Sequence, residues 1–316
     1  MDKPLISICM PAFNAGAHIL QTVYSVIGQT YEHWELIIID DGSTDDTAQK
    51  LSSLADERII IRRQENLGQC AACNEAFHLS KGNLIKFMDA DDLLSANYLE
   101  AQEKALRNTT DAIAYSAWGR FYDDAVNEAR PDPSLVTGDM RPFDWLQASM
   151  TEKEVMLQCA LWLIPRNILL RSGLWDERLS LINDFEFFIR ILLRARELKY
   201  AGGTMLYYRS GLQGSLSAAT SAAAAESAYR SIDLGTGYLL EFSSSPEVKK
   251  IAADCFQRFI YSFYPRQPVL VEQAVIKVKQ LGGSSLPFPA GGYTQIMARL
   301  LGWKMTRRIK NFLNNR

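Results

Sequence analysis

The first part of the chain alternates short, uniformly apolar runs with longer stretches in which apolar side chains recur every three or four positions. Uniform runs are typical of strands buried on both faces, and the longer spacing is typical of amphipathic helices. The runs predict strands at residues 5–10, 34–39, 58–62 and 83–88. The stretches between them predict helices at residues 17–28, 44–55 and 68–80. This alternation predicts an α/β fold with a mostly parallel central sheet flanked by helices.

The pattern changes after residue 107. It predicts strands at 112–118 and 159–164, an exposed polar loop at 123–139 and a helix at 185–194. Beyond residue 213 the chain is rich in Ala and Ser, which predicts helices at 222–240 and 246–263. A Gly-, Pro- and Ser-rich linker precedes a last helix. We expect a domain at 1–212 with halves 1–107 and 108–212, a helical extension at 213–281, a linker at 282–292 and a helix at 293–316.

Carboxylates follow three of these apolar segments. Asp40 and Asp41 end the second strand, Asp89, Asp91 and Asp92 end the fourth, and Asp184 precedes the helix at 185–194. Strands of a parallel sheet all point the same way, so the first two clusters should share one edge, where α/β proteins bind ligands. Such clusters repel unless a cation or a donor-rich ligand sits among them. The alternative is an Asp-rich turn or helix N-caps.

Smaller signals have structural interpretations. Thr44 is a plausible N-cap for the helix at 44–55. Gly82 and Gly173 fit helix ends. Four tryptophans are expected to pack in the core, although each could stack on a sugar: Trp118, Trp145, Trp162 and Trp175.

The composition narrows the class of protein. An apolar share of 47% and a charged share of 22% are typical of a globular protein, and a net charge of −2 gives no reason to expect a nucleic-acid partner. The five cysteines form no zinc-site pattern and fit free thiols in a reducing cytosol. The chain shows neither a signal-peptide pattern nor an apolar run of about 20 residues. We therefore expect a cytoplasmic protein.

The C-terminal end has its own charge pattern. The last acidic residue is Glu272, and eight basic residues follow it, which suggests an anionic partner. Apolar residues recur at helical spacing, with Trp303 at the border of the face they form: Met297, Leu300, Leu301, Met305, Ile309 and Leu313. A basic amphipathic helix of this kind can lie on an anionic membrane surface, or it can dock its apolar face on the rest of the protein. The sequence favours neither.

The ordered motifs of residues 4–210 resemble family 2 glycosyltransferases with the GT-A fold. The residues that carry the resemblance are Pro11-Ala12-Phe13-Asn14, Ser25 to Tyr31, Glu35 to Asp45, Asn66-Leu67-Gly68, Asn74, Gly82, Phe87 to Asp92, Gly173 to Glu177 and Asn183 to Phe187. Each motif is short, but the ordered set is specific. The resemblance does not extend to the last third of the chain.

The resemblance implies a role for each matching residue. Asp184 would be the catalytic base, Asp91 would bind a Mn²⁺ or Mg²⁺ ion, and Asp89 would hold the ribose and assist the metal. The nucleotide would contact Pro11, Ala12, Phe13, Asn14, Asp40, Asp41, Asn66, Gly68, Asp89 and Ala90. Asp41 in particular would hydrogen-bond the base, and Pro11 and Phe13 would shape its pocket.

The chain departs from the family pattern in three respects. Cys73 replaces the basic residue often found before Asn74, and no His follows Tyr207-Tyr208-Arg209-Ser210. The Gln-x-x-Arg-Trp motif of processive polysaccharide synthases is absent, as are their membrane spans. This favours the addition of one sugar per encounter.

The resemblance implies an inverting transfer of one sugar from a nucleotide-diphosphate sugar, UDP-linked in many relatives, to a hydroxyl of a saccharide or lipid-linked saccharide. Bacterial polysaccharide, O-antigen or capsule synthesis is the expected setting, either in the cytoplasm or on the inner face of the membrane. One alternative is a non-catalytic nucleotide-sugar binding module. The other, a sugar nucleotidyltransferase, would want a basic Gly-rich loop after the first strand, which residues 11–16 lack.

Overall fold

The computed structural model describes residues 3–107, 109, 111–151, 155–212 and 221–314. The chain has two compact units, Met1–Ser215 and Leu216–Arg316. The first unit holds the strands β1 Ile6–Ala12, β2 Trp34–Asp40, β3 Ile59–Arg63, β4 Leu84–Phe87, β5 Leu93–Leu94, β6 Ala112–Phe121, β7 Trp162–Pro165 and β8 Glu197–Arg209. Its helices are α1 Ile19–Ile27, α2 Thr47–Leu51, α3 Gln69–Leu79, α4 Tyr98–Leu106, α5 Pro142–Met150, α6 Arg166–Ser172 and α7 Asn183–Leu192. Two short 3₁₀ turns, η1 Val126–Glu128 and η2 Cys159–Leu161, complete it.

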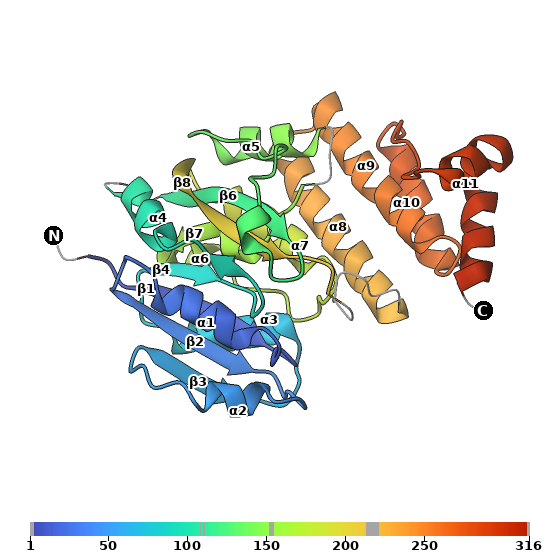
Figure 1. Ribbon diagram of the computed structural model, residues 1–316. Helices are drawn as coiled ribbons and strands as arrows, with labels where there is room; N and C mark the ends of the chain where they lie inside the picture. The colour runs from blue at the N-terminus through green and yellow to red at the C-terminus, as the bar shows by residue number, and fades with distance from the viewer. Residues whose placement is uncertain (1–2, 108, 110, 152–154, 213–220, 315–316) are drawn as a thin grey trace. The chain divides into compact units, whose positions relative to one another are not determined.

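The described strands form one sheet in the order β3-β2-β1-β4-β7-β6-β8-β5 (Figure 1). The first four run parallel, as their apolar runs predict. β7 is antiparallel to both β4 and β6, β8 is parallel to β6, and β5 is antiparallel to β8. Helices pack on the sheet: α3 contacts β1 and β2, and α4 contacts β6 and β8. The predicted α/β fold with a mostly parallel central sheet flanked by helices is confirmed, and the antiparallel pairs of β7 and β5 make the sheet a mixed one.

The four candidate core tryptophans are buried, which confirms their packing role. Trp118, Trp145, Trp162 and Trp175 are each at most 4% exposed. Trp175 stacks on Phe187 of α7 with ring centroids 3.8 Å apart. The tryptophans therefore consolidate the sheet and its covering helices.

Two local predictions are wrong. α2 begins at Thr47, not near Thr44, because Asp45 accepts hydrogen bonds from both Thr47 N and Thr47 Oγ1. Gly82 does not end a helix, since α3 stops at Leu79. A Cβ at Gly82 would lie 2.6 Å from Leu5 O and 2.8 Å from Ser7 N, so the position is a close approach of two backbones. Gly173, with a φ of 85°, does cap α6 as predicted.

The second unit is helical. It contains α8 Ala222–Phe242, α9 Pro246–Phe263, α10 Pro268–Gln280 and α11 Tyr293–Asn314. Ser221 and Ser245 cap α8 and α9 with side-chain oxygens that accept from backbone N–H groups three residues on, and α9 packs against both α8 and α10. Residues 213–220 of the predicted extension lie outside the described residues.

The last helix is not continuous. Gly302 has a φ of 74° and a ψ of 155°, so α11 is two helical segments joined at a kink, and the predicted single apolar face is wrong. Trp303 packs edge-on against Tyr261 and Tyr264 of the same unit. The side chain of Leu313 lies outside the described residues. None of the described helices is long and apolar enough to cross a membrane.

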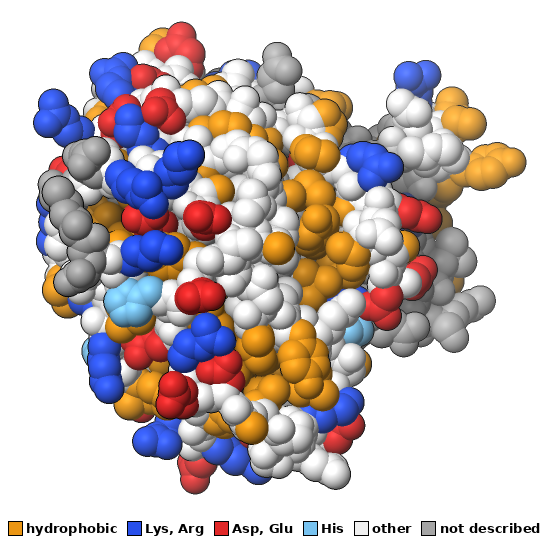
Figure 2. Space-filling view, turned by 60° about the vertical axis from the view of Figure 1, so that its left-hand side comes forward, with side chains coloured by type: hydrophobic (Ala, Val, Ile, Leu, Met, Phe, Trp, Pro, Cys, Tyr) orange, Lys and Arg blue, Asp and Glu red, His pale blue; other side chains and the backbone are white. Residues whose placement is uncertain are grey.

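Surface charges of both signs are interspersed. On the face drawn in Figure 2, Lys and Arg side chains lie among Asp and Glu side chains. One example is the partly exposed pair Arg58–Asp56 of the first unit, at 2.7 Å. Exposed pairs of this kind contribute at most about 1 kcal/mol each to stability.

Candidate active site

The parallel half of the sheet gathers the predicted site residues at one edge. β1 and β2 end side by side with Ala12 paired to Asp40, and β4 runs parallel to β1 on its other side. Asp41 N donates to Ala12 O at 2.8 Å, and Asp89 lies just past the end of β4. The prediction that the first two acidic clusters share an edge is therefore confirmed.

The loop after β1 is tied to the loop after β2. Pro11 and Ala12 are buried, whereas Phe13 is 50% exposed. Asn14 has a left-handed backbone with a φ of 50°, and its Oδ1 accepts a hydrogen bond from Thr44 N at 2.8 Å. The turn therefore leaves the Phe13 ring accessible at the sheet edge while its backbone is held in place.

Asp40 is buried and shapes the turn that follows β2. Its Oδ1 accepts a hydrogen bond from Ser43 N at 2.9 Å. Its Oδ2 lies 3.6 Å from Arg63 Nε on β3. These contacts hold the carboxylate within the turn.

Asp41 organises the segment before α3. Its Oδ1 accepts from Gln64 Nε2 at 2.7 Å and from Leu67 N at 2.9 Å, and its Oδ2 accepts from Gly68 N at 2.9 Å. Gly68 has a φ of 94°, which favours glycine. Asn66, in the same turn, is exposed. Asp41 thus fixes the backbone beside the exposed Asn66 and retains lone pairs for a further donor.

The turn after β4 concentrates negative charge. Asp89 and Asp91 are partly exposed, whereas Ala90 and Asp92 are buried. Burial raises the pKa of Asp89, and burial with the charge of Asp89 raises the pKa of Asp91 to about 6. Burial and then the neighbouring carboxylates raise the pKa of Asp92 well above its usual range. The positive charge of the surrounding protein therefore does not offset the burial of these carboxylates and the repulsion between them.

Arg209, at the end of β8, braces this turn. Its backbone N donates to Asp92 Oδ1 at 3.0 Å, and its Nε donates to Asp91 O at 2.9 Å. Its guanidinium also pairs with Asp124 and donates to Gln21 Oε1. The side chain is only 5% exposed, so its donors serve mainly to fix the acidic turn.

Asp184 lies in the first turn of α7. The helix begins at Asn183 and its N-cap is Ile182, with no side-chain cap hydrogen bond, so the interpretation of Asp184 as an N-cap is wrong. Among the described residues, its buried Oδ1 has no hydrogen-bond partner. Burial, and after it the negative charge of Asp89, raises the pKa of Asp184 well above its usual range. A carboxylate in this state readily accepts a proton.

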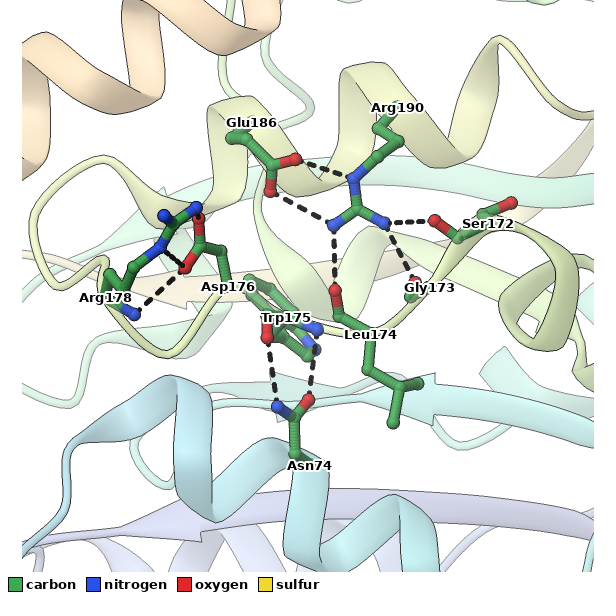
Figure 3. Close-up of polar contacts among 9 residues, drawn as sticks. All are labelled: Asn74, Ser172, Gly173, Leu174, Trp175, Asp176, Arg178, Glu186 and Arg190. Carbon is green, nitrogen blue, oxygen red and sulfur yellow. Dashed lines mark hydrogen bonds and ion pairs between the residues drawn. The ribbon is translucent and has the colours of Figure 1, made fainter.

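A polar cluster fixes the segment between α6 and α7 (Figure 3). Asn74 on α3 donates through Nδ2 to Trp175 O at 3.0 Å and accepts from Trp175 N at 3.0 Å. Arg190 of α7 donates to the carbonyls of residues 172–174 and pairs with Glu186 at 2.6 Å. Asn74 thus has a structural role here, because it holds the chain that leads into α7.

The acidic turn fits a divalent cation. Carboxylate oxygens are the ligands that Mg²⁺ and Mn²⁺ prefer, and the pKa of Asp91 is raised by burial and then by the negative charge of Asp89, which a cation would neutralise. Among the described residues, no set of three or more His, Cys, Asp or Glu side chains is arranged to hold a metal by itself. A cation here would thus take its remaining ligands from a bound molecule and from water.

Two residues that the sequence interpretation passed over join the site. Gln69 Nε2 donates to Asp89 Oδ1 at 2.9 Å, and Asn183 Nδ2 donates to Gln69 Oε1 at 3.1 Å. Asn183 falls within a matching motif, but the sequence gives no sign of its partner. Gln69 lies in none of the matching motifs, and a glutamine at the start of a helix is equally compatible with a solvent-exposed position.

Comparisons with known proteins agree with this geometry. WfgD of Escherichia coli, named UDP-Glc:alpha-D-GlcNAc-diphosphoundecaprenol beta-1,3-glucosyltransferase, is 41% identical over 138 residues, covering 43% of this chain and 54% of WfgD. The uncharacterized glycosyltransferase MJ1057 of Methanocaldococcus jannaschii is 26% identical over 217 residues, covering 66% of this chain and 72% of MJ1057. The chain spans about half the length of curated relatives such as WfgD.

Solved structures share the fold. Residues 1–349 of S. aureus TarS, crystallised in complex with UDP-GlcNAc, superpose with a TM-score of 0.63 at 14% identity, covering 88% of this chain and 89% of that chain. This likeness confirms the predicted GT-A fold. The family model for glycosyl transferase family 2 matches residues 7–171, which is just over half of the 316 residues and includes both strand-end acidic clusters. The chain therefore belongs to glycosyl transferase family 2.

Proposed function

We propose that this protein transfers a single sugar from a nucleotide-diphosphate sugar, UDP-linked, to an acceptor hydroxyl with inversion at the anomeric carbon. The observation that carries the proposal is Asp184, whose pKa is raised well above its usual range by burial and by Asp89 and whose Oδ1 has no partner among the described residues. An acceptor hydroxyl must lose a proton as it attacks, and this carboxylate is suited to take it.

The donor would lie along the edge where β1, β2 and β4 end. Phe13 offers an exposed ring to a base, and the turn held by Asp41 forms the adjoining wall. Asp89 would accept hydrogen bonds from ribose hydroxyls. Complexes of TarS with UDP and with UDP-GlcNAc support a UDP-linked donor for this fold.

Asp91, with Asp89, would hold a Mn²⁺ or Mg²⁺ ion. Such an ion supplies Lewis-acid stabilisation of a diphosphate leaving group. GalNAc-T7, a structural neighbour with a TM-score of 0.56, was crystallised with UDP, GalNAc and Mn²⁺. The acceptor hydroxyl would attack the anomeric carbon directly, without a covalent intermediate on a carboxylate nucleophile. A single displacement of this kind inverts the anomeric configuration.

The test combines turnover, donor binding and product stereochemistry. Asp184→Asn keeps the shape of the side chain but removes the proton acceptor, so we expect turnover to fall roughly 10²-fold or more with UDP affinity nearly intact. Asp144→Asn, at a partly exposed carboxylate paired with Arg141 on α5, is the control and should keep full turnover. NMR of the product should show an inverted anomeric configuration.

Four results would contradict the proposal. Normal turnover of Asp184→Asn would remove it as the base. Turnover in EDTA equal to that with Mn²⁺ would remove the metal. Donor binding without release of UDP, across a panel of acceptors, would instead indicate a binding module. Formation of a sugar nucleotide from a nucleoside triphosphate would indicate a nucleotidyltransferase.

We further propose that the acceptor is lipid-linked and that α11 brings the enzyme to an anionic membrane surface on its inner face, within bacterial cell-surface polysaccharide synthesis. The acceptor in the name of WfgD, a diphosphoundecaprenol-linked sugar, supports a lipid-linked acceptor. On α11, Leu300 is 79% exposed, Leu301 53% and Met305 50%. Exposed apolar side chains among basic ones are typical of helices that lie in a membrane interface.

The charge on α11 matches such a surface. Four of its basic side chains are exposed: Arg299, Lys304, Arg308 and Lys310. At about 1 kcal/mol each near an anionic bilayer, they would contribute roughly 4 kcal/mol, and this contribution would weaken as salt is added. Arg307 instead donates to Ser262 O within the unit.

Flotation with phosphatidylglycerol vesicles tests this part. We expect the intact protein to float with anionic vesicles, and the double variant Leu300→Glu/Leu301→Glu to remain unbound. The control Val269→Glu/Ile276→Glu, at positions on α10 that are 67% and 49% exposed, adds the same two charges elsewhere and should float normally. An intact protein that never floats, or a double variant that floats as well as the control, would contradict the membrane proposal but not the proposed chemistry.

A further inference from the structure

A chain of side-chain hydrogen bonds connects the donor edge of the sheet to the proposed base. Gln69, the first residue of α3, donates from Nε2 to Asp89 Oδ1 at 2.9 Å. Its Oε1 accepts from Asn183 Nδ2 at 3.1 Å. Asn183 Oδ1 in turn accepts from Asp184 N at 3.0 Å. We call Gln69 and Asn183 the amide relay.

Asn183 is locked within this arrangement. It is 5% exposed, and its Nδ2 also lies 3.3 Å from Cys70 Sγ, which is buried on the same turn of α3. With the contacts to Gln69 and Asp184 N, nearly all of its hydrogen-bonding capacity is used. A side chain held from three directions fixes the first turn of α7 against the first turn of α3.

The backbone just before the relay is strained. Ile182 has a φ of 61° and a ψ of 24°, a left-handed conformation that a β-branched residue rarely adopts. Such a conformation persists where the surroundings over-determine it, and it is concentrated at functional sites. Here it lies directly before Asn183 and Asp184, so the fold accepts local strain in order to start α7 at this place.

The two hydrogen bonds of Gln69 require an amide side chain. Gln69 donates to a carboxylate at one end and accepts from an amide at the other, which neither a carboxylate nor an ammonium side chain can do. Its bond to Asp89 is made to one oxygen, Oδ1, and the Cys159 side chain is a second hydrogen-bonding neighbour of this carboxylate. The relay therefore sets the orientation of Asp89 and the start of α7 together.

We propose that Gln69 and Asn183 are positioning residues that align the base Asp184 with the donor held at Asp89. This rests on the proposed function, because it assumes that Asp184 takes the acceptor's proton. The amide relay contacts neither of the reacting atoms. It acts by fixing the positions of the Asp89 and Asp184 carboxylates relative to each other, and small errors in this alignment lower turnover far more than they lower donor binding.

The test separates turnover from donor binding. Gln69→Leu and Asn183→Leu remove the polar ends at similar volume, and we expect each to lower kcat roughly 10- to 100-fold while the Kd for UDP, measured by calorimetry with Mn²⁺, changes less than about threefold. If both act through one relay, the double variant should be no slower than the slower single variant, because coupled residues are non-additive.

Two further variants control for folding. Gln102→Leu removes another buried glutamine, which donates to Leu161 O on the same unit, and should keep normal kcat. Gln69→Asn keeps the amide but is one methylene shorter, so it cannot span both partners and should lower kcat even if Gln69→Leu fails to fold.

The outcomes are distinct. Normal kcat in Gln69→Asn and Asn183→Leu, with Asp184→Asn inactive, would overturn the relay and leave the proposed function standing. Strictly multiplicative losses in the double variant, or UDP affinity that falls in step with kcat, would also overturn it. Normal turnover in Asp184→Asn would instead remove the proposed function on which the relay rests.

Discussion

Lys86 makes the stability of the first unit depend on pH in a way that can be measured. The side chain is fully buried on β4, and its Nζ donates to Ala160 O at 2.8 Å and to Trp162 O at 3.0 Å. No ion pair among the described residues includes it. Burial lowers the pKa of Lys86 from 10.5 to about 7. We predict that Lys86→Met removes a specific pH dependence of the free energy of unfolding.

The sign follows from proton binding. Below about pH 7 Lys86 is charged in both states, so its burial cost is fully present. Between about pH 7 and 10.5 the unfolded chain keeps the proton that the folded chain has lost, so stability rises with pH. For these two pKa values, the free energy of unfolding should gain about 2 kcal/mol between pH 7 and pH 9.

Urea unfolding followed by tryptophan fluorescence at both pH values measures this gain. Buried thiols such as Cys73 have raised pKa values and push stability the other way as pH rises, but they do so equally in both proteins and cancel in the comparison. Lys104→Met, at an exposed lysine on α4, is the matched control and should track the wild type. If the difference between wild type and Lys86→Met is the same at pH 7 and pH 9, the reasoning is wrong.

Two further predictions concern backbone geometry. Gly82→Ala should lower the free energy of unfolding by roughly 1–3 kcal/mol, because the added Cβ would lie 2.6 Å from Leu5 O. The control Gly237→Ala places its Cβ in open space on α8 and should be neutral or stabilising in the same urea titration. Equal unfolding midpoints for the two variants would contradict this prediction. Asp41→Asn should weaken UDP binding, measured by calorimetry, roughly tenfold or more, because the new NH₂ group would face a backbone N–H at Leu67 or Gly68. Unchanged UDP affinity would show that the turn before α3 keeps its conformation without the carboxylate.

Three of the four parallel strands, β1, β2 and β4, are predictable because they are buried at every position, whereas β3 is only partly buried. β1 and β2 therefore appear in the sequence as mainly apolar runs, interrupted only by Ser7 in β1 and by Glu35 before the terminal Asp40 in β2. β8 is different: it alternates irregularly between buried and exposed positions and contains Gly202 and Gly203, so no run identifies it. The kink at Gly302 was also hidden, since a helical spacing of apolar residues continues across it.

The acidic residues of the site are predictable for the same reason, because they end runs that can be recognised. Their supporting contacts are not. The bond between Gln69 and Asn183 joins residues 114 positions apart, and that between Asn74 and Trp175 joins residues 101 positions apart. A side-chain amide in a helix carries no mark of its partner, so only the packing of α3 against α7 and the segment before it reveals these links.

The acidic turn shows how the site trades stability for binding. Burial raises the pKa of Asp89, and burial together with repulsion from neighbouring carboxylates raises the pKa values of Asp91 and Asp92. Burial, and after it repulsion from Asp89, also raises the pKa of Asp184. Arg209 is the cation that braces this turn, and its Nε bonds the backbone of Asp91, not its carboxylate. Four carboxylates held in this way cost folding free energy that a ligand with positive charge or hydrogen-bond donors would recover. A ligand that binds only the folded state stabilises it by an amount that rises with the logarithm of the ratio of ligand concentration to Kd, so the same charges that weaken the free protein would strengthen the binding of such a ligand.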